Sequence, residues 1–244
     1  MKARKDQGII TELDQEYKRQ ENAFLKHIAN QLGRPRIQSQ PQRTEIGAPE
    51  FWKNYYLEKE ERIHLFMKNW QSLDGIAKRF SALQEIPTYI AQILTEIKAQ
   101  KIIRWNHPLF EAMELDKKLE DIKTIIWDKR NNSHLLAETA NADCGIVVAD
   151  YAIAHTGTIV VTSAPTQGRS VSLLPNVLVA IIQAKNIQTR MGEVFSKIQH
   201  RYTQLPAGIH FITGPSRSAD IENDLTIGVH GPGIVYALII DNEA

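Results

Sequence analysis

Short apolar runs alternate with helical patterns along most of this chain, and this alternation limits its fold more than any other feature. Strand-like runs fall at residues 102–105, 122–127, 145–148, 158–161, 177–182, 209–213 and 235–240. Helical patterns fall near residues 76–85, 88–100, 108–120 and 187–202. Such interleaving predicts an α/β protein with a mostly parallel sheet layered with helices.

The first part of the chain has a different organisation. Apolar residues recur at helical spacing over about residues 9–32 and again over residues 52–70. Residues 33–43, between these segments, are polar and contain two prolines, Pro35 and Pro41. We therefore expect a helical N-terminal extension over residues 1–70, with a Pro/Gln-rich linker at 33–50, and an α/β domain over residues 71–244. The leading helix could dock on another chain or fold back on its own domain.

Composition excludes several classes of protein and site. The formal net charge of +1 gives no electrostatic footprint for nucleic acid. No apolar run is long enough to span a bilayer or to follow the first residues as a signal peptide, so we expect a cytoplasmic location. The single cysteine, Cys144, excludes an internal disulfide and any multi-cysteine metal site built by this chain alone, and its apolar neighbours favour a buried structural thiol.

Three segments place polar groups beside glycines at the ends of predicted strands. Residues 214–222 read Gly-Pro-Ser-Arg-Ser-Ala-Asp-Ile-Glu, and residues 228–233 read Gly-Val-His-Gly-Pro-Gly. Strand ends are where an open α/β sheet usually binds its ligand. The third segment, His155-Thr156-Gly157, lies between two short β-like runs and predicts a hairpin or sharp corner in which Gly157 adopts a positive φ.

Four motifs in this order resemble the lactate-utilization protein C family, which is built on the LUD domain. They are residues 149–158 (Ala-Asp-Tyr-Ala-Ile-Ala-His-Thr-Gly-Thr), 172–175 (Ser-Leu-Leu-Pro), 214–222 and 228–232. The resemblance implies a fold similar to the sugar-phosphate isomerase and coenzyme A transferase group. Two positions depart from the family pattern: His155 stands where an acidic residue is common, and Gly233 where a basic one is common.

The same resemblance implies a biological role. Members of this family take part in bacterial oxidation of L-lactate to pyruvate, so the resemblance implies that this chain acts with an iron-sulfur LUD-domain protein and a cysteine-rich oxidoreductase subunit. We expect no cofactor in this chain and iron-sulfur clusters in the partner subunits, because one cysteine cannot hold a cluster. The chain would then be an accessory subunit of a lactate-oxidising complex. The alternative is an autonomous enzyme or sensor that binds a small carboxylate, a sugar phosphate or an acyl-coenzyme A.

The candidate site residues each have a second interpretation. Arg217 could bind a carboxylate or phosphate, or it could pair with Asp220 or Glu222. Ser216 could offer its hydroxyl and amide to an anion at the start of a helical turn, or it could only cap that turn. Asp220 could bind a ligand hydroxyl or orient Arg217. The expected ligand-binding set is Thr156, Gly157, Thr158, Gly214, Ser216, Arg217, Asp220 and Gly231.

Catalytic residues are not assigned by the sequence, although two histidines are candidates. His155 could accept protons near neutral pH. His230 could carry protons, or it could be a buried histidine bonded to backbone. Asp150 could lie near the same crevice or serve only as a turn carboxylate. No pair of histidines has the spacing of a helical metal site, and no P-loop or dinucleotide fingerprint is present.

Overall fold

The computed structural model describes residues 2–36, 52, 54–128, 134–219 and 225–241. The chain divides into two compact units, Met1–Asn54 and Tyr55–Ala244. The first unit contains helix α1 (Lys2–Gln31), which includes the helix expected over residues 9–32 and begins earlier. Most of the linker expected at residues 33–50 lies outside the described residues. No helix in the described part of the chain has the length and apolarity needed to cross a membrane.

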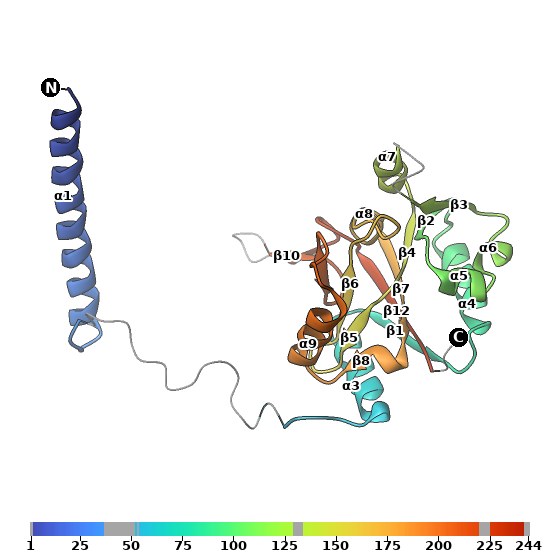
Figure 1. Ribbon diagram of the computed structural model, residues 1–244. Helices are drawn as coiled ribbons and strands as arrows, with labels where there is room; N and C mark the ends of the chain where they lie inside the picture. The colour runs from blue at the N-terminus through green and yellow to red at the C-terminus, as the bar shows by residue number, and fades with distance from the viewer. Residues whose placement is uncertain (1, 37–51, 53, 129–133, 220–224, 242–244) are drawn as a thin grey trace. The chain divides into compact units, whose positions relative to one another are not determined.

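A six-stranded sheet forms the centre of the second unit (Figure 1). Every pair of neighbouring strands in it is parallel. The strands in spatial order are β1 (Ile76–Phe80), β12 (Ile234–Ile240), β7 (Val177–Gln183), β4 (Cys144–Val148), β2 (Lys101–Trp105) and β3 (Lys123–Trp127). The sheet confirms the predicted α/β class, because its central strands are the uninterrupted apolar runs that burial on both faces requires.

A smaller mixed sheet has the order β8-β5-β6-β9. Its strands are β8 (Ile187–Gln188), β5 (Tyr151–Ile153), β6 (Thr158–Thr162) and β9 (Ile209–Ile212). Strands β5 and β6 form the predicted hairpin around His155-Thr156-Gly157, and β6 also pairs antiparallel with β9. A separate two-stranded hairpin joins β10 (Arg217–Ala219) to β11 (Leu225–Ile227).

Helices connect and cover the strands of both sheets (Figure 1). They are α3 (Lys59–Gln71), α4 (Glu85–Glu96), α5 (Pro108–Ala112), α6 (Leu115–Lys118), α7 (Leu135–Ala140), α8 (Ser170–Leu173), the 3-10 turn η1 (Ala184–Asn186) and α9 (Met191–Arg201). Helix α4 turns a stripe at spacing i, i+4, i+7, i+8 toward the large sheet, which is how an amphipathic helix buries one face.

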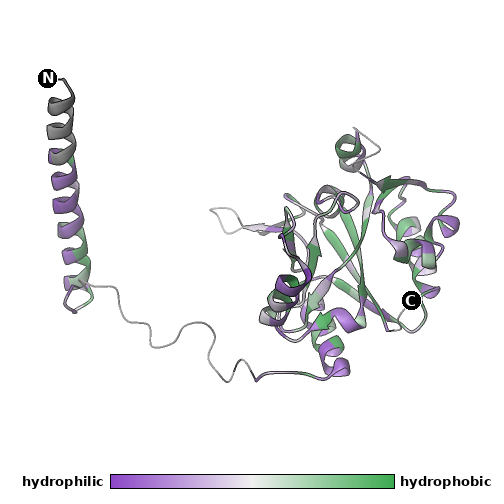
Figure 2. Ribbon diagram, viewed as in Figure 1, coloured by the Kyte–Doolittle hydropathy of each residue, from purple (hydrophilic) through white to green (hydrophobic). Residues whose placement is uncertain are grey.

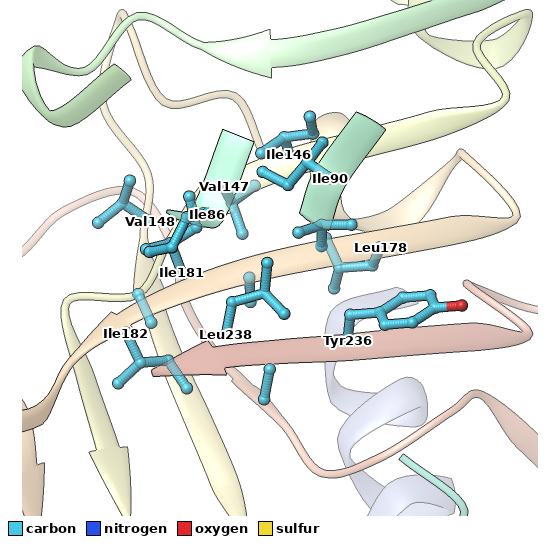
Figure 3. Close-up of a cluster of buried hydrophobic side chains, with 14 of the residues drawn as sticks. Ile86, Ile90, Ile146, Val147, Val148, Leu178, Ile181, Ile182, Tyr236 and Leu238 are labelled. Carbon is cyan, nitrogen blue, oxygen red and sulfur yellow. The ribbon is translucent and has the colours of Figure 1, made fainter. Parts of the chain in front are cut away.

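The hydrophobic core lies against the large sheet. Figure 2 shows hydrophobic residues concentrated along its strands, and Figure 3 shows Ile86 and Ile90 of α4 beside strand residues such as Leu178. Phe66 and Trp70 of α3 are fully buried in the same cluster. Because these two aromatic side chains belong to the core, α3 is part of the second unit.

Several predicted boundaries differ from the structure. Residues 76–80, predicted as helix, form the edge strand β1, whose exposed Lys78 and Arg79 broke the apolar run that marks a strand. The expected helix 108–120 is two short helices separated at Glu114, which has φ of 51°. The helix expected at 187–202 begins at Met191, and within the described residues 54–70 the helix begins at Lys59. The two compact units meet between residues 54 and 55 in the sequence.

Candidate functional site

Two of the predicted site segments meet at one edge of the small sheet. Strands β5 and β9 both run antiparallel to β6, so both end where β6 begins. A chain of hydroxyl groups links them there. Thr156 Oγ1 lies 2.7 Å from Thr158 Oγ1, which lies 2.9 Å from Thr213 Oγ1. The strands before Thr156 and Gly214 therefore end on the same side of this sheet, which is mixed and not parallel.

The two Gly-Pro segments also contact each other. The Ser216 amide donates to the carbonyl of Pro232 at 2.9 Å, and the Gly228 amide donates to the carbonyl of Ser216 at 2.9 Å. A Cβ placed on Gly231 would lie 3.2 Å from the Ser216 Cβ. We refer to residues 154–158, 213–217 and 228–233 together as the glycine-rich cluster.

The glycine-rich cluster lies at the amino edge of the large sheet. Residues 228–233 lead into the start of β12, where the Asn176 carbonyl accepts the amides of Gly233 at 2.9 Å and Ile234 at 3.2 Å. Asn176 itself precedes β7. Gly214 follows the carboxyl end of β9, whereas residues 228–233 precede β12 and lie at its amino end. Strand β12 is parallel to its neighbours and reaches the cluster because the two sheets meet there.

Arg217 forms an ion pair that the sequence did not suggest. Its Nη2 lies 2.5 Å from Asp74 Oδ2, in the loop between α3 and β1, and both side chains remain partly exposed. The predicted partners Asp220 and Glu222 lie outside the described residues. Ser216 precedes strand β10 and starts no helical turn, so the predicted capping role is wrong. The Ser216 amide is already bonded within the cluster and cannot also face an anion.

The two candidate catalytic histidines are exposed. His155 packs its ring edge-on to Tyr55, with ring centroids 6.1 Å apart. Helix α3 holds the backbone at His155, since Asn69 Nδ2 donates to the carbonyls of Ala154 at 2.8 Å and His155 at 2.9 Å. His230 is exposed in its loop, so the alternative of a buried histidine is wrong.

Two glycines of the cluster are required by close approach to α3 and the loop after it. Gly157 has φ of 59°, and a Cβ there would lie 2.6 Å from the Trp70 amide nitrogen. Gly214 has φ of 76°, and a Cβ there would lie 2.9 Å from the Leu73 Cβ. Both glycines therefore adopt a left-handed conformation in space that a side chain cannot enter. Packing accounts for these two members of the predicted ligand-binding set.

A second polar cluster lies at the carboxyl ends of β2 and β4. Asp150 is nearly buried, and its Oδ2 accepts the amide and the hydroxyl of Thr162, both at 2.8 Å. Its Oδ1 accepts Arg201 Nη1 at 2.8 Å. The Tyr202 hydroxyl lies 3.1 Å from Thr162 Oγ1. We call these four residues, together with His107 after β2, the carboxyl-edge cluster.

The position of the carboxyl-edge cluster is typical of ligand sites in open sheets. From β2 the chain moves outward to β3, whereas from β4 it moves in the opposite direction to β7. The strand order therefore reverses between β2 and β4, and the crevice above such a point is the usual binding place. The sequence suggested Asp150 only for the crevice of the glycine-rich segments or for a turn, whereas the structure places it with Thr162 and Arg201. The other members were missed because they come from separate elements with no shared motif.

His107 is held as a neutral imidazole. Its Nδ1 accepts the Leu109 amide at 3.1 Å at the start of α5, which leaves the proton of the neutral ring on Nε2. Burial lowers the pKa of His107, and this effect outweighs the opposing charge of Asp150; Arg201 lowers the pKa further. At neutral pH this ring can donate a hydrogen bond from Nε2.

Comparison with known proteins identifies close relatives of the whole chain. The model of the LUD domain matches residues 63–240. Lactate utilization protein C of Halalkalibacterium halodurans is 32% identical, over 90% of this chain and 97% of its own. The protein of the same name from Shouchella clausii is 32% identical, over 91% and 98%. A crystal structure of a DUF162 family protein from Deinococcus radiodurans superposes with a TM-score of 0.53 at 21% identity, covering 75% of this chain and 99% of that one, and supports the fold alone.

Proposed function

The chain belongs to the LUD domain family, and from this membership we propose that it serves in the utilization of L-lactate by bacteria. The observation that carries the proposal is its 32% identity to a lactate utilization protein C over 97% of that protein's length. Agreement over nearly the whole relative, and not over one motif, supports a shared role. The reaction served would be the oxidation of L-lactate to pyruvate.

Within that role, we propose that the chain is an accessory subunit without a redox cofactor of its own. Removing two electrons from a 2-hydroxy acid needs an acceptor. The one cysteine, Cys144, lies fully buried in β4, where burial raises the pKa of its thiol far above the usual range. Such a thiol is a poor metal ligand. Iron-sulfur partner subunits would then accept the electrons.

The glycine-rich cluster is the proposed binding place for a small carboxylate. Arg217 offers a guanidinium about one third exposed, and planar guanidinium groups bind carboxylates in a fork. The hydroxyls of Thr156 and Thr158 belong to the same cluster and lie 2.7 Å apart. We propose that the ligand-binding set acts here, with Gly157 and Gly214 shaping the walls and the side chains making contact. Asp220 remains a proposed member outside the described residues.

A growth experiment tests the role. A Halalkalibacterium halodurans strain lacking its lactate utilization protein C would be supplied with this chain and grown on L-lactate as sole carbon source. We expect growth to be restored, with no difference on glucose. If the chain is expressed and soluble and lactate growth is still absent, the proposed role is contradicted.

Calorimetry with L-lactate and pyruvate tests the binding place. Loss of a charged hydrogen bond in Arg217→Ala should weaken binding by roughly 1.5–3 kcal/mol, or about 10-fold to 150-fold. Asp74→Ala is the matched control, because it removes the partner of Arg217 and leaves the guanidinium in place. It should bind as tightly as the wild type or more tightly. Equal affinity in the wild type and Arg217→Ala would show that Arg217 is not a ligand contact.

The alternative of an autonomous enzyme or sensor is favoured by one observation, the carboxyl-edge cluster at the reversal of strand order. A lactate-dependent dye-reduction assay separates the two roles. An accessory subunit should show no dye reduction when pure, and activity only with its partners added. Turnover by the pure chain would favour the autonomous enzyme.

A further inference from the structure

A hollow of about 240 Å³ lies at the carboxyl ends of β7 and β12, and none of its lining residues belongs to either cluster described above. Its lining comes from the first turn of α3, the ends of the two strands and η1. The residues are Lys59, Arg62, Gln183, Ala184, Lys185, Ile240 and Asp241. We propose that this hollow is a binding site for a phosphate group, presented as a free phosphate anion or on a small phosphorylated metabolite.

Charge is the first argument for a phosphate. Three of the lining side chains are cationic, and Asp241 is the one carboxylate among the described lining residues. That carboxylate is already engaged, because Arg79 Nε lies 2.8 Å from each of its oxygens. Lys59 Nζ donates to the main-chain carbonyl of Asp241, at 3.4 Å. Lys59 and Arg62 therefore give the described lining of the hollow a positive charge that an anion would neutralise.

Arg62 supplies the second argument. Its Nε is buried and has no hydrogen-bond partner among the described residues. A buried guanidinium N–H without a partner is destabilising, and an oxyanion in the hollow would satisfy it. Arg62 follows Lys59 by three residues on α3, so the two side chains project from the same face of the helix. Both can therefore reach one ligand.

Size and position agree with a small phosphate-bearing ligand. At about 30 Å³ for each water in the liquid, the hollow has the volume of roughly eight waters, which suffices for phosphate, pyrophosphate or a phosphorylated three-carbon compound. A phosphate group has three free oxygens that can accept hydrogen bonds from Lys59 and Arg62, whereas a carboxylate has two. The carboxyl edge of a parallel sheet is also where open α/β folds commonly bind ligands.

Calorimetry on the full chain, at constant ionic strength, tests the site with three probes. Phosphate and pyrophosphate represent free anions, and glycerol 3-phosphate represents a phosphorylated metabolite. We expect saturable binding of one equivalent of at least one probe, and the probe bound most tightly identifies the source. Lys59→Gln and Arg62→Gln should each weaken that binding at least tenfold. Lys68→Gln is the matched control, since it removes the same charge from an exposed position of the same helix outside the hollow.

Two outcomes would overturn the proposal. One is the absence of saturable binding of any probe by the wild type, and the other is an equal effect of all three variants. Thermal melting shows whether each variant is folded. If Arg62→Gln fails to fold, Lys59→Gln still tests the site, because Lys59 is exposed and its replacement should not disturb the fold. Tighter binding of L-lactate than of any phosphate, abolished by the same variants, would also contradict it. The site does not depend on the role in lactate growth, which is scored separately.

Discussion

Replacing Gly157 by alanine should destabilise the second unit strongly, because the new Cβ would enter the backbone of α3. It would lie 2.6 Å from the Trp70 nitrogen and 2.7 Å from the Asn69 carbonyl carbon, where ordinary contacts begin near 3.4 Å. Neither atom can rotate away. The left-handed conformation alone costs about 1–2 kcal/mol for alanine, and overpacking adds about 1–3 kcal/mol. The expected loss is about 2–5 kcal/mol of unfolding free energy.

Thermal denaturation followed by circular dichroism measures this loss. For a unit of this size, 1 kcal/mol corresponds to about 2–4 °C, so the midpoint should fall by roughly 4–20 °C. Gly192→Ala is the matched control, since a Cβ there meets nothing within 4 Å and the position lies in the first turn of α9. Its stability should be unchanged or higher by up to about 1 kcal/mol. If Gly157→Ala melts within about 1 °C of the wild type, α3 does not approach the turn as described.

Three further predictions concern buried titratable groups. Asp150→Asn should lose about 2–4 kcal/mol of unfolding free energy, because it breaks a nearly buried charge network. Asp74→Asn, at an exposed ion pair, should lose less than about 1 kcal/mol. Equal chemical denaturation curves for the two variants would refute this. Cys144 should resist a thiol reagent in the native protein and react only on unfolding; rapid native labelling would contradict its burial. Burial lowers the pKa values of His107 and His210, so their contribution to stability should be complete above the unfolded value of 6.5 and decline as pH falls below it. His107→Asn, which keeps a capping side chain, should flatten that decline in melts from pH 7 to pH 5; an unchanged slope would refute the assignment.

The central strands and the edge strand β3 could be predicted from the sequence, whereas the edge strand β1 could not. Strands β4, β7 and β12 are buried along most of their length, so their residues are almost all apolar and the run is visible without any knowledge of neighbours. Strand β1 has one paired side and exposes most of its residues, so its spacing resembled that of a helix. Strands β8 and β10 hold two and three residues, which is too short for a period to be recognised.

The residues of one candidate site could be predicted from the sequence, but the position of that site in the fold and the members of the other site could not. Residues 154–158, 213–217 and 228–233 could be grouped because glycine and proline mark turns in the sequence itself. Which edge of which sheet they occupy depends on strand pairing, and the sequence contains no local signal for that. The carboxyl-edge cluster was missed for the same reason. His107, Thr162 and Arg201 come together only through the order of the strands, and none of them stands in a recognisable motif.

Variants of Arg217 can show whether the glycine-rich cluster stabilises the fold, binds a ligand or does both. Gly157 and Gly214 are explained by packing against α3 and the loop that follows it, so changing them alters the fold and reveals nothing about a ligand. The ion pair between Arg217 and Asp74 is different, because the two side chains are 32% and 72% exposed and such pairs contribute at most about 1 kcal/mol. The fold therefore does not require Arg217. If Arg217→Ala melts like the wild type and loses carboxylate affinity or lactate growth, the cluster holds a ligand as well as bracing α3. If it melts like the wild type and loses neither, the four motifs that mark the family maintain the fold, and the search for the ligand site moves to the carboxyl edge.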